Sequence, residues 1–189
     1  MAARPGRHTV RRDGMPERTV PEPNRSRGAS MLHLLELPDP GHELLLARYD
    51  AVMEEALRRL EAAFLDAGGD WVEQMRAALA HLLALAAANP ELTRLATIEI
   101  FEAGQPGLDR RDDWMLRFMG LCETGYAQSG LLRPPTELMG QVVVGAVFEL
   151  IRSHATEDRL DQLSDALPTA TLIVLSPIIG RDAALQAAG

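Results

Sequence analysis

The residues of this chain best suited to chemistry are one cysteine and five histidines. The histidines, His8, His33, His42, His81 and His154, are too dispersed for the short ligand spacing of a sequence-local metal site, although a site assembled in space stays open. The chain has no Gly-x-Ser-x-Gly, Gly-x-Gly-x-x-Gly, phosphate-binding-loop or His-Glu-x-x-His motif. We therefore expect no enzymatic activity, no resident metal and no cofactor.

The single cysteine, Cys122, lies among Phe118, Met119 and Leu121 on a predicted helix. A free cysteine in such a setting is usually a small core residue, and no flanking cation is evident that would lower its thiol pKa. Lining of a pocket is the alternative. One cysteine forms no intramolecular disulfide, which fits a reducing, cytoplasmic location.

The charge is divided unevenly along the chain. Residues 1–30 hold seven arginines against three acidic residues, and the other residues hold 12 arginines against 24 acidic residues. An acidic body repels the nucleic-acid backbone, so any DNA binding must be local. Residues 1–30 are also rich in Arg, Pro, Gly and Ser, which predicts a disordered tail. The longest apolar runs, residues 142–148 and 172–175, are too short to cross a bilayer, so we expect a soluble protein without a membrane partner.

About seven helices are predicted, in an all-α fold. The first follows a turn at residues 38–41, contains Glu54–Arg58 and Glu55–Arg59 pairs, and ends at Gly68-Gly69. Asp70 and Glu73 form a capping box for the second. The others are predicted from Asn89-Pro90 to Gly104, over residues 108–129, from Pro134-Pro135-Thr136 to His154, from Asp158 to before Pro168, and from Thr169 to Gly180.

The second, third and fourth helices carry Met and aromatic residues at helical spacing. Such stripes belong either to a closed core or to the wall of an apolar cavity, and the two readings are about equally favoured. Polar groups that could orient a ligand there are His81, Glu99, Glu102 and Cys122.

The last two long helices are apolar on more than one face. Gly140, Gly145 and Ala146 interrupt a valine-rich run, and residues 169–179 are apolar nearly all round. A helix of this kind is buried on more than one face, and a second subunit would supply that cover. A helix central to its own fold is the alternative.

Several segments together resemble the regulatory domain of TetR family transcription factors over roughly residues 41–180. They are the helix start at 89–92, the break at 102–106, the restart at 109–112, the apolar segment 140–151 and the closing segment 175–180. Residues 41–50, with His42-Glu43-Leu44, are similar to the family's junction between its DNA-binding domain and a connector helix. No helix-turn-helix is recognisable upstream, so we interpret residues 31–41 as a remnant or junction.

The resemblance implies that residues 42–189 are a ligand-binding domain that dimerises through a four-helix bundle. It implies a small hydrophobic effector, a homodimer and control of transcription, with DNA as a partner only if a helix-turn-helix exists upstream or unrecognised. The expected ligand-binding residues are Met75, Leu79, Leu82, Phe101, Met115, Phe118, Cys122 and Phe148. The expected dimer residues are Gly140, Val144, Gly145, Phe148, Leu172, Leu175 and Ile179. The alternative is a helical interaction or sequestration module without DNA binding.

Overall fold

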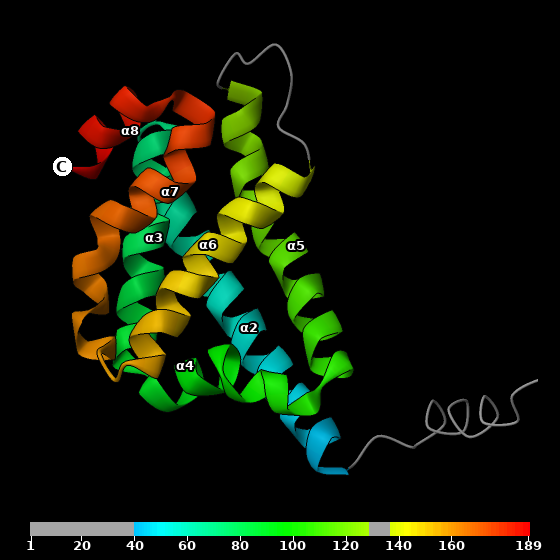
Figure 1. Cartoon of the computed structure of the whole chain (residues 1–189). Coiled ribbons are helices and arrows are strands. Elements are labelled where there is room, and N and C mark those ends of the chain that lie inside the picture. The colour runs from blue at the N-terminus through cyan, green and yellow to red at the C-terminus, as the bar shows by residue number, and fades with distance from the viewer. Residues whose placement is uncertain (1–39, 129–136) are drawn as a thin grey trace, which may run out of the picture. The chain divides into compact units, whose positions relative to one another are not determined.

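The computed structural model describes residues 40–128 and 137–189, and every regular element among them is a helix, as the sequence predicted (Figure 1). The elements are α2 (Pro40–Asp66), α3 (Trp71–Ala88), α4 (Pro90–Thr97), the 3-10 helix η2 (Glu99–Ala103), α5 (Gln105–Gln128), α6 (Glu137–Thr156), the 3-10 helix η3 (Leu160–Ala166), α7 (Leu167–Ile179) and α8 (Arg181–Ala188). The predicted tail 1–30, residues 31–39 and the Pro134-Pro135-Thr136 helix start lie outside the described residues.

Helix α2 begins at Pro40, where the sequence predicted a turn through residue 41. Proline suits a first helical position because its fixed φ is helical and its missing N–H would have no partner there. The buried face, Tyr49, Met53, Leu57, Leu60 and Phe64, follows three- and four-residue steps. The chain then turns at Gly68 and Gly69, whose φ angles of 63° and 75° favour glycine.

The capping box that was predicted for α3 is confirmed. The Asp70 carboxylate accepts from the Glu73 backbone N–H at 3.0 Å, and the Glu73 carboxylate accepts from the Asp70 N–H at 3.2 Å. The prediction that Asn89 caps the following helix is wrong. Its side chain makes no capping hydrogen bond to α4. Its amide donates to the Leu85 carbonyl at 2.8 Å and so closes the end of α3 instead.

The third predicted helix is divided into α4 and η2 at Ile98. The Ile98 N–H still bonds four residues back to Arg94, at 2.8 Å, whereas the Phe101 N–H bonds three residues back to Ile98, at 3.2 Å. This tighter winding brings Ile100 to complete burial, so tertiary packing decides the break. Gly104, at a φ of 62°, ends η2 where the sequence predicted a helix end.

The C-terminal elements differ from prediction at their starts. Asp158 lies at a φ of 56° and makes an ion pair with Arg94 rather than capping η3. Helix α7 starts at Leu167, with Pro168 in its first turn, so Thr169 is already inside the helix. The sequence analysis did not predict α8, which packs on α7.

One stretch, Leu160–Ile179, has the length and mean hydropathy of a membrane span, although the apolar runs in the sequence were expected to be too short for one. In the structure it is divided between η3 and α7. Residues Ala170, Thr171, Val174, Leu175 and Ile178 of α7 are buried within the chain, and 39% of the apolar window as a whole is buried.

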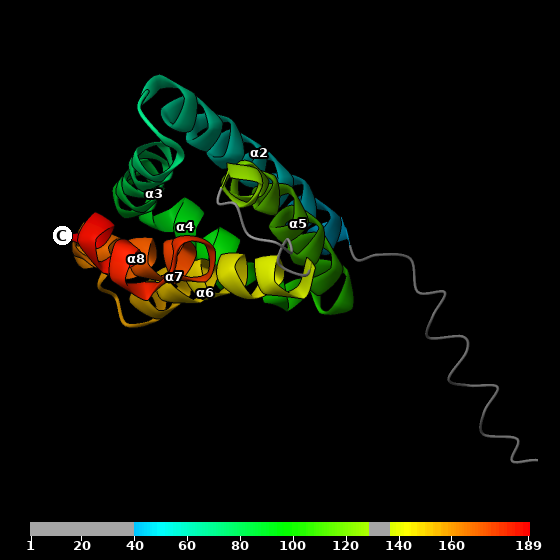
Figure 2. The same ribbon diagram turned by 90° about the horizontal axis from the view of Figure 1, so that it is seen from above.

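The buried side chains form two clusters. One joins α3, α6, α7 and α8 to the end of α2, and the other joins the middle of α2 to α4, η2 and the middle of α5. Phe118 and Leu121 of α5 pack against both clusters. Figure 2 shows α2 and α5 together on one side of this unit and α6, α7 and α8 on the other.

Candidate functional site

A cavity of about 360 Å³ lies where the two buried clusters meet. Its size falls at the lower end of the range of small-molecule pockets. Nearly all of its wall is apolar, and six helices contribute to it. Representative wall residues are Val52, Ala56 and Leu60 of α2, Met75, Leu79 and Leu82 of α3, Ala96 of α4, Met115, Phe118 and Cys122 of α5, Val143, Val147 and Phe148 of α6, and Val174 of α7.

Seven of the eight residues predicted to bind a ligand line this cavity. They are Met75, Leu79, Leu82, Met115, Phe118, Cys122 and Phe148. Phe101 does not. It is half-buried on η2, and its ring meets Phe148 edge-on with centroids 6.4 Å apart. The break at Ile98 gives η2 a different path from the continuous helix that was predicted, and Phe101 lies on the far side of Phe148 from the cavity, beside a second hollow.

The contribution of α2 to the cavity was missed by the sequence analysis. Val52, Ala56 and Leu60 line the wall, together with the Glu55 and Arg59 side chains. The apolar three- and four-residue steps on α2 were visible, but they indicate only that a helix face is buried. A partner helix and an unfilled space give the same pattern.

The polar side chains in the cavity interior are already satisfied. Thr93 donates its hydroxyl to the Ala86 carbonyl at 2.8 Å, and Thr97 donates to the Thr93 carbonyl at 2.7 Å. Both threonines are buried. This part of the wall therefore presents a ligand mainly with carbon, since a satisfied hydroxyl has little hydrogen-bonding capacity left.

Cys122 also belongs to this wall. It is buried, and burial, with a smaller contribution from Glu123, raises the pKa of its thiol to about 11. The thiol therefore stays protonated at neutral pH and acts as a small apolar group. It is both a core residue and a cavity residue, so the two interpretations made from the sequence are compatible.

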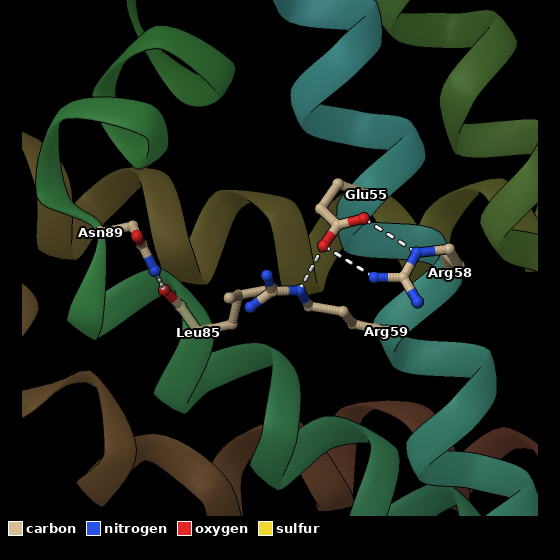
Figure 3. Close-up of polar contacts among 5 residues, drawn as sticks. All are labelled: Glu55, Arg58, Arg59, Leu85 and Asn89. Atoms are coloured by element: carbon tan, nitrogen blue, oxygen red, sulfur yellow. Dashed lines mark hydrogen bonds and ion pairs between the residues drawn. The ribbon is translucent and has the colours of Figure 1, made fainter.

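Charged groups of the cavity wall are confined to one place, where Glu55 and Arg59 of α2 lie (Figure 3). Glu55 accepts from Arg59 Nε at 2.6 Å and from Arg58 Nε and Nη2, both at 2.8 Å. These hydrogen bonds lower the pKa of Glu55 to about 2. The predicted Glu54–Arg58 pair is not formed, because Arg58 turns to Glu55 instead.

Three other polar candidates lie away from the cavity. His81 and Glu102 are exposed, Glu99 is half-buried, and none of the three lines the wall. His81 lies on the expected helix but on its exposed side, and Glu99 and Glu102 lie on η2, which the sequence had placed in one continuous helix with α4.

Asp50 links α2 to α5 beside the cavity. Its carboxylate accepts from the buried Trp114 indole N–H at 2.9 Å and makes an ion pair with Arg110. Tyr49, the adjacent residue, is completely buried, and its hydroxyl has no hydrogen-bond partner among the described residues. Burial raises the pKa of this phenol, so it stays neutral.

Four of the predicted dimer residues face their own chain. Leu175 is fully buried, Gly140 is buried with a would-be Cβ only 2.5 Å from Met119 Cε, and Val144 and Phe148 line the cavity. Gly145 has open space beyond its Cα, whereas Leu172 and Ile179 are half-buried.

The outward face of α6 carries a different set of apolar residues. Leu138 and Val142 are 67% and 58% exposed, and Gly145 continues the same row at a helical step. The dimer residues of α6 were chosen for apolar character and for small size, and neither property separates inward from outward positions in a valine-rich helix.

Among residues 40–128 and 137–189, no three His, Cys, Asp or Glu side chains are grouped closely enough to hold a metal ion. Comparisons of the chain with protein-family models, with curated proteins and with solved structures found no match.

Proposed function

We propose that this chain is a TetR-like ligand-sensing and dimerisation domain of a transcriptional regulator, and that a small hydrophobic effector binds in the cavity between α2 and α7. The apolar cavity of about 360 Å³ is the observation that carries this proposal. An unfilled apolar space loses packing contacts, and an apolar ligand regains them when it enters.

The position of α2 provides a way to transmit binding. Val52, Ala56 and Leu60 put α2 in direct contact with any occupant, and Asp50 ties the same helix to α5. In the proposed mechanism the ligand favours one position of α2 relative to α5 and α6 and shifts the population toward it. In a TetR-like dimer, such a shift changes the spacing of the two connector helices.

A two-fold homodimer through the outward face of α6, together with α7, is part of the proposal. The exposed Leu138 and Val142 and the open Gly145 support it, because small and apolar residues let two helices approach closely. We expect the dimer to bury on the order of 1,500 Å² in total. Val142→Arg and Gly145→Arg should each give monomers in sedimentation experiments, and an unaltered dimer in both would place the interface elsewhere.

The ligand site is tested by thermal shift with hydrophobic metabolites. A ligand specific for the native state stabilises it by about 2.7 kcal/mol at a hundredfold excess over Kd. Phe118→Arg places a charge in the cavity and should abolish the shift in a variant whose circular dichroism still shows folded helix. A shift that persists in that variant would show that the ligands bind at another site.

The alternative is a helical dimeric interaction or sequestration module without DNA binding. The acidic excess outside residues 1–30, 24 acidic residues against 12 arginines, favours it. The two functions are separated by selection from random duplex DNA. A sequence-specific complex that survives about 200 mM salt supports the regulator and excludes the module, whereas weak, salt-sensitive binding is expected of both because no helix-turn-helix is recognisable in the chain.

A further inference from the structure

We propose that the cavity ligand is an amphipathic carboxylate, with an acyl chain of medium length, whose carboxylate is bound by Arg59. The inference rests on the proposed function of the cavity as a ligand site and adds the chemical class of the ligand.

The size and lining of the interior specify the apolar part. A cavity of about 360 Å³ is at the lower end of the range for small-molecule pockets, so it suits a ligand of modest size. Because the Thr93 and Thr97 hydroxyls already donate to backbone carbonyls, a ligand gains little from polar groups at this part of the wall. A hydrocarbon chain of medium length fits both conditions.

The charged end of the cavity specifies the head group. Glu55 and Arg59 are the charged residues of its wall, and Arg59 is half exposed, with a side-chain exposure of 46%. Figure 3 shows Arg59 extending from α2 in the direction of Leu85 on α3, and both residues line the cavity. Only the Nε of Arg59 is bonded, to Glu55, so its two Nη groups have no hydrogen-bond partner among the described residues. They can donate to a ligand carboxylate in the paired geometry that guanidinium groups favour.

The local charge balance selects an anion over a cation. The Glu55 carboxylate already accepts from two guanidinium groups, those of Arg58 and Arg59. The three side chains therefore carry a net charge of one positive, in a body that is otherwise acidic. An ammonium head group finds no unpaired carboxylate here and is repelled, whereas a carboxylate is attracted.

Isothermal titration with three matched ligands tests this assignment at neutral pH, at concentrations where each ligand is dissolved as single molecules. The full chain should bind decanoate at least about fivefold more tightly than 1-decanol and should bind decylamine most weakly. A fivefold difference in affinity corresponds to the strength of a well-placed but partly exposed ion pair. Arg59→Gln should abolish the preference for decanoate over decanol and leave decanol binding unchanged.

Arg58→Gln is the matched control, because Arg58 binds the same carboxylate but does not line the cavity. It should keep a clear preference for decanoate. Glu55→Gln removes the competing carboxylate and should strengthen decanoate binding further.

Equal affinity for decanoate and decanol in the unmodified chain would overturn the head-group assignment while leaving the cavity as an apolar ligand site. Equal losses in Arg58→Gln and Arg59→Gln would overturn it too, since the effect would then reflect surface charge. Failure of all three ligands to bind, or decanol binding that survives Phe118→Arg, would reject the cavity itself as the site and with it the proposed function.

Discussion

Replacing Ala56 by leucine tests whether the space between the helices is a true void. Ala56 lies in the middle of α2, is half-buried and lines the cavity. Alanine and leucine both favour helix, so the backbone should accept the change. The added carbons would enter the cavity, where the other walls are apolar.

The expected gain in stability follows from the added area. Leucine adds three carbons, each worth about 0.8 kcal/mol when fully buried. Ordering the longer side chain costs about 0.5–1 kcal/mol. Because the half-buried position leaves part of the side chain exposed, we expect a net stabilisation of about 1 kcal/mol. In a chain of this size, that raises the midpoint of thermal unfolding by about 2–4 °C.

Ala78→Leu is the matched control on α3. Ala78 is fully buried in the core and does not line the cavity, so the same substitution must force its neighbours apart. Overpacking of this kind costs about 1–3 kcal/mol. Calorimetry of the two variants should therefore give shifts of opposite sign. Destabilisation of similar size in both would show that α2 packs against a filled core, and the reasoning behind the ligand site would fail.

Three further outcomes follow from single interactions. Cys122 should react with thiol reagents about a hundredfold more slowly than an ordinary thiol at the same pH, because its raised pKa lowers the thiolate fraction by that factor, and rapid labelling would contradict its burial. Asp50→Ala should lower the free energy of unfolding by about 2 kcal/mol, since it leaves the buried Trp114 N–H unpaired, whereas Asp50→Asn retains an acceptor and should cost less than about 1 kcal/mol. Asp70→Ala should cost about 1 kcal/mol in urea unfolding through loss of the α3 cap, and an unchanged midpoint would mean that the cap contributes nothing.

Local signals in the sequence determined the helical elements. The Asp70 and Glu73 capping box, the glycine pair at 68–69 and the endings at Gly104 and Gly180 act within a few residues of the positions they define. Such signals are readable because the groups that satisfy one another are neighbours in the chain. Where a tertiary partner competed, the prediction was wrong. Asn89 closes the helix before it, and Asp158 pairs with Arg94, 64 residues away, rather than capping η3.

The composition of the predicted helices also indicated which side chains face inward, and seven of the eight residues chosen from it line one cavity. The sequence could not decide between a filled and an unfilled interior, because both need the same apolar face. The cavity results only from the way the six helices pack together. The same packing makes α2 part of the cavity wall and places Arg59 there. The same limit applies to α6. Leu138 points outward and Gly140 inward because the rotation of the helix is fixed by contacts such as that of Gly140 with Met119, which are distant in sequence.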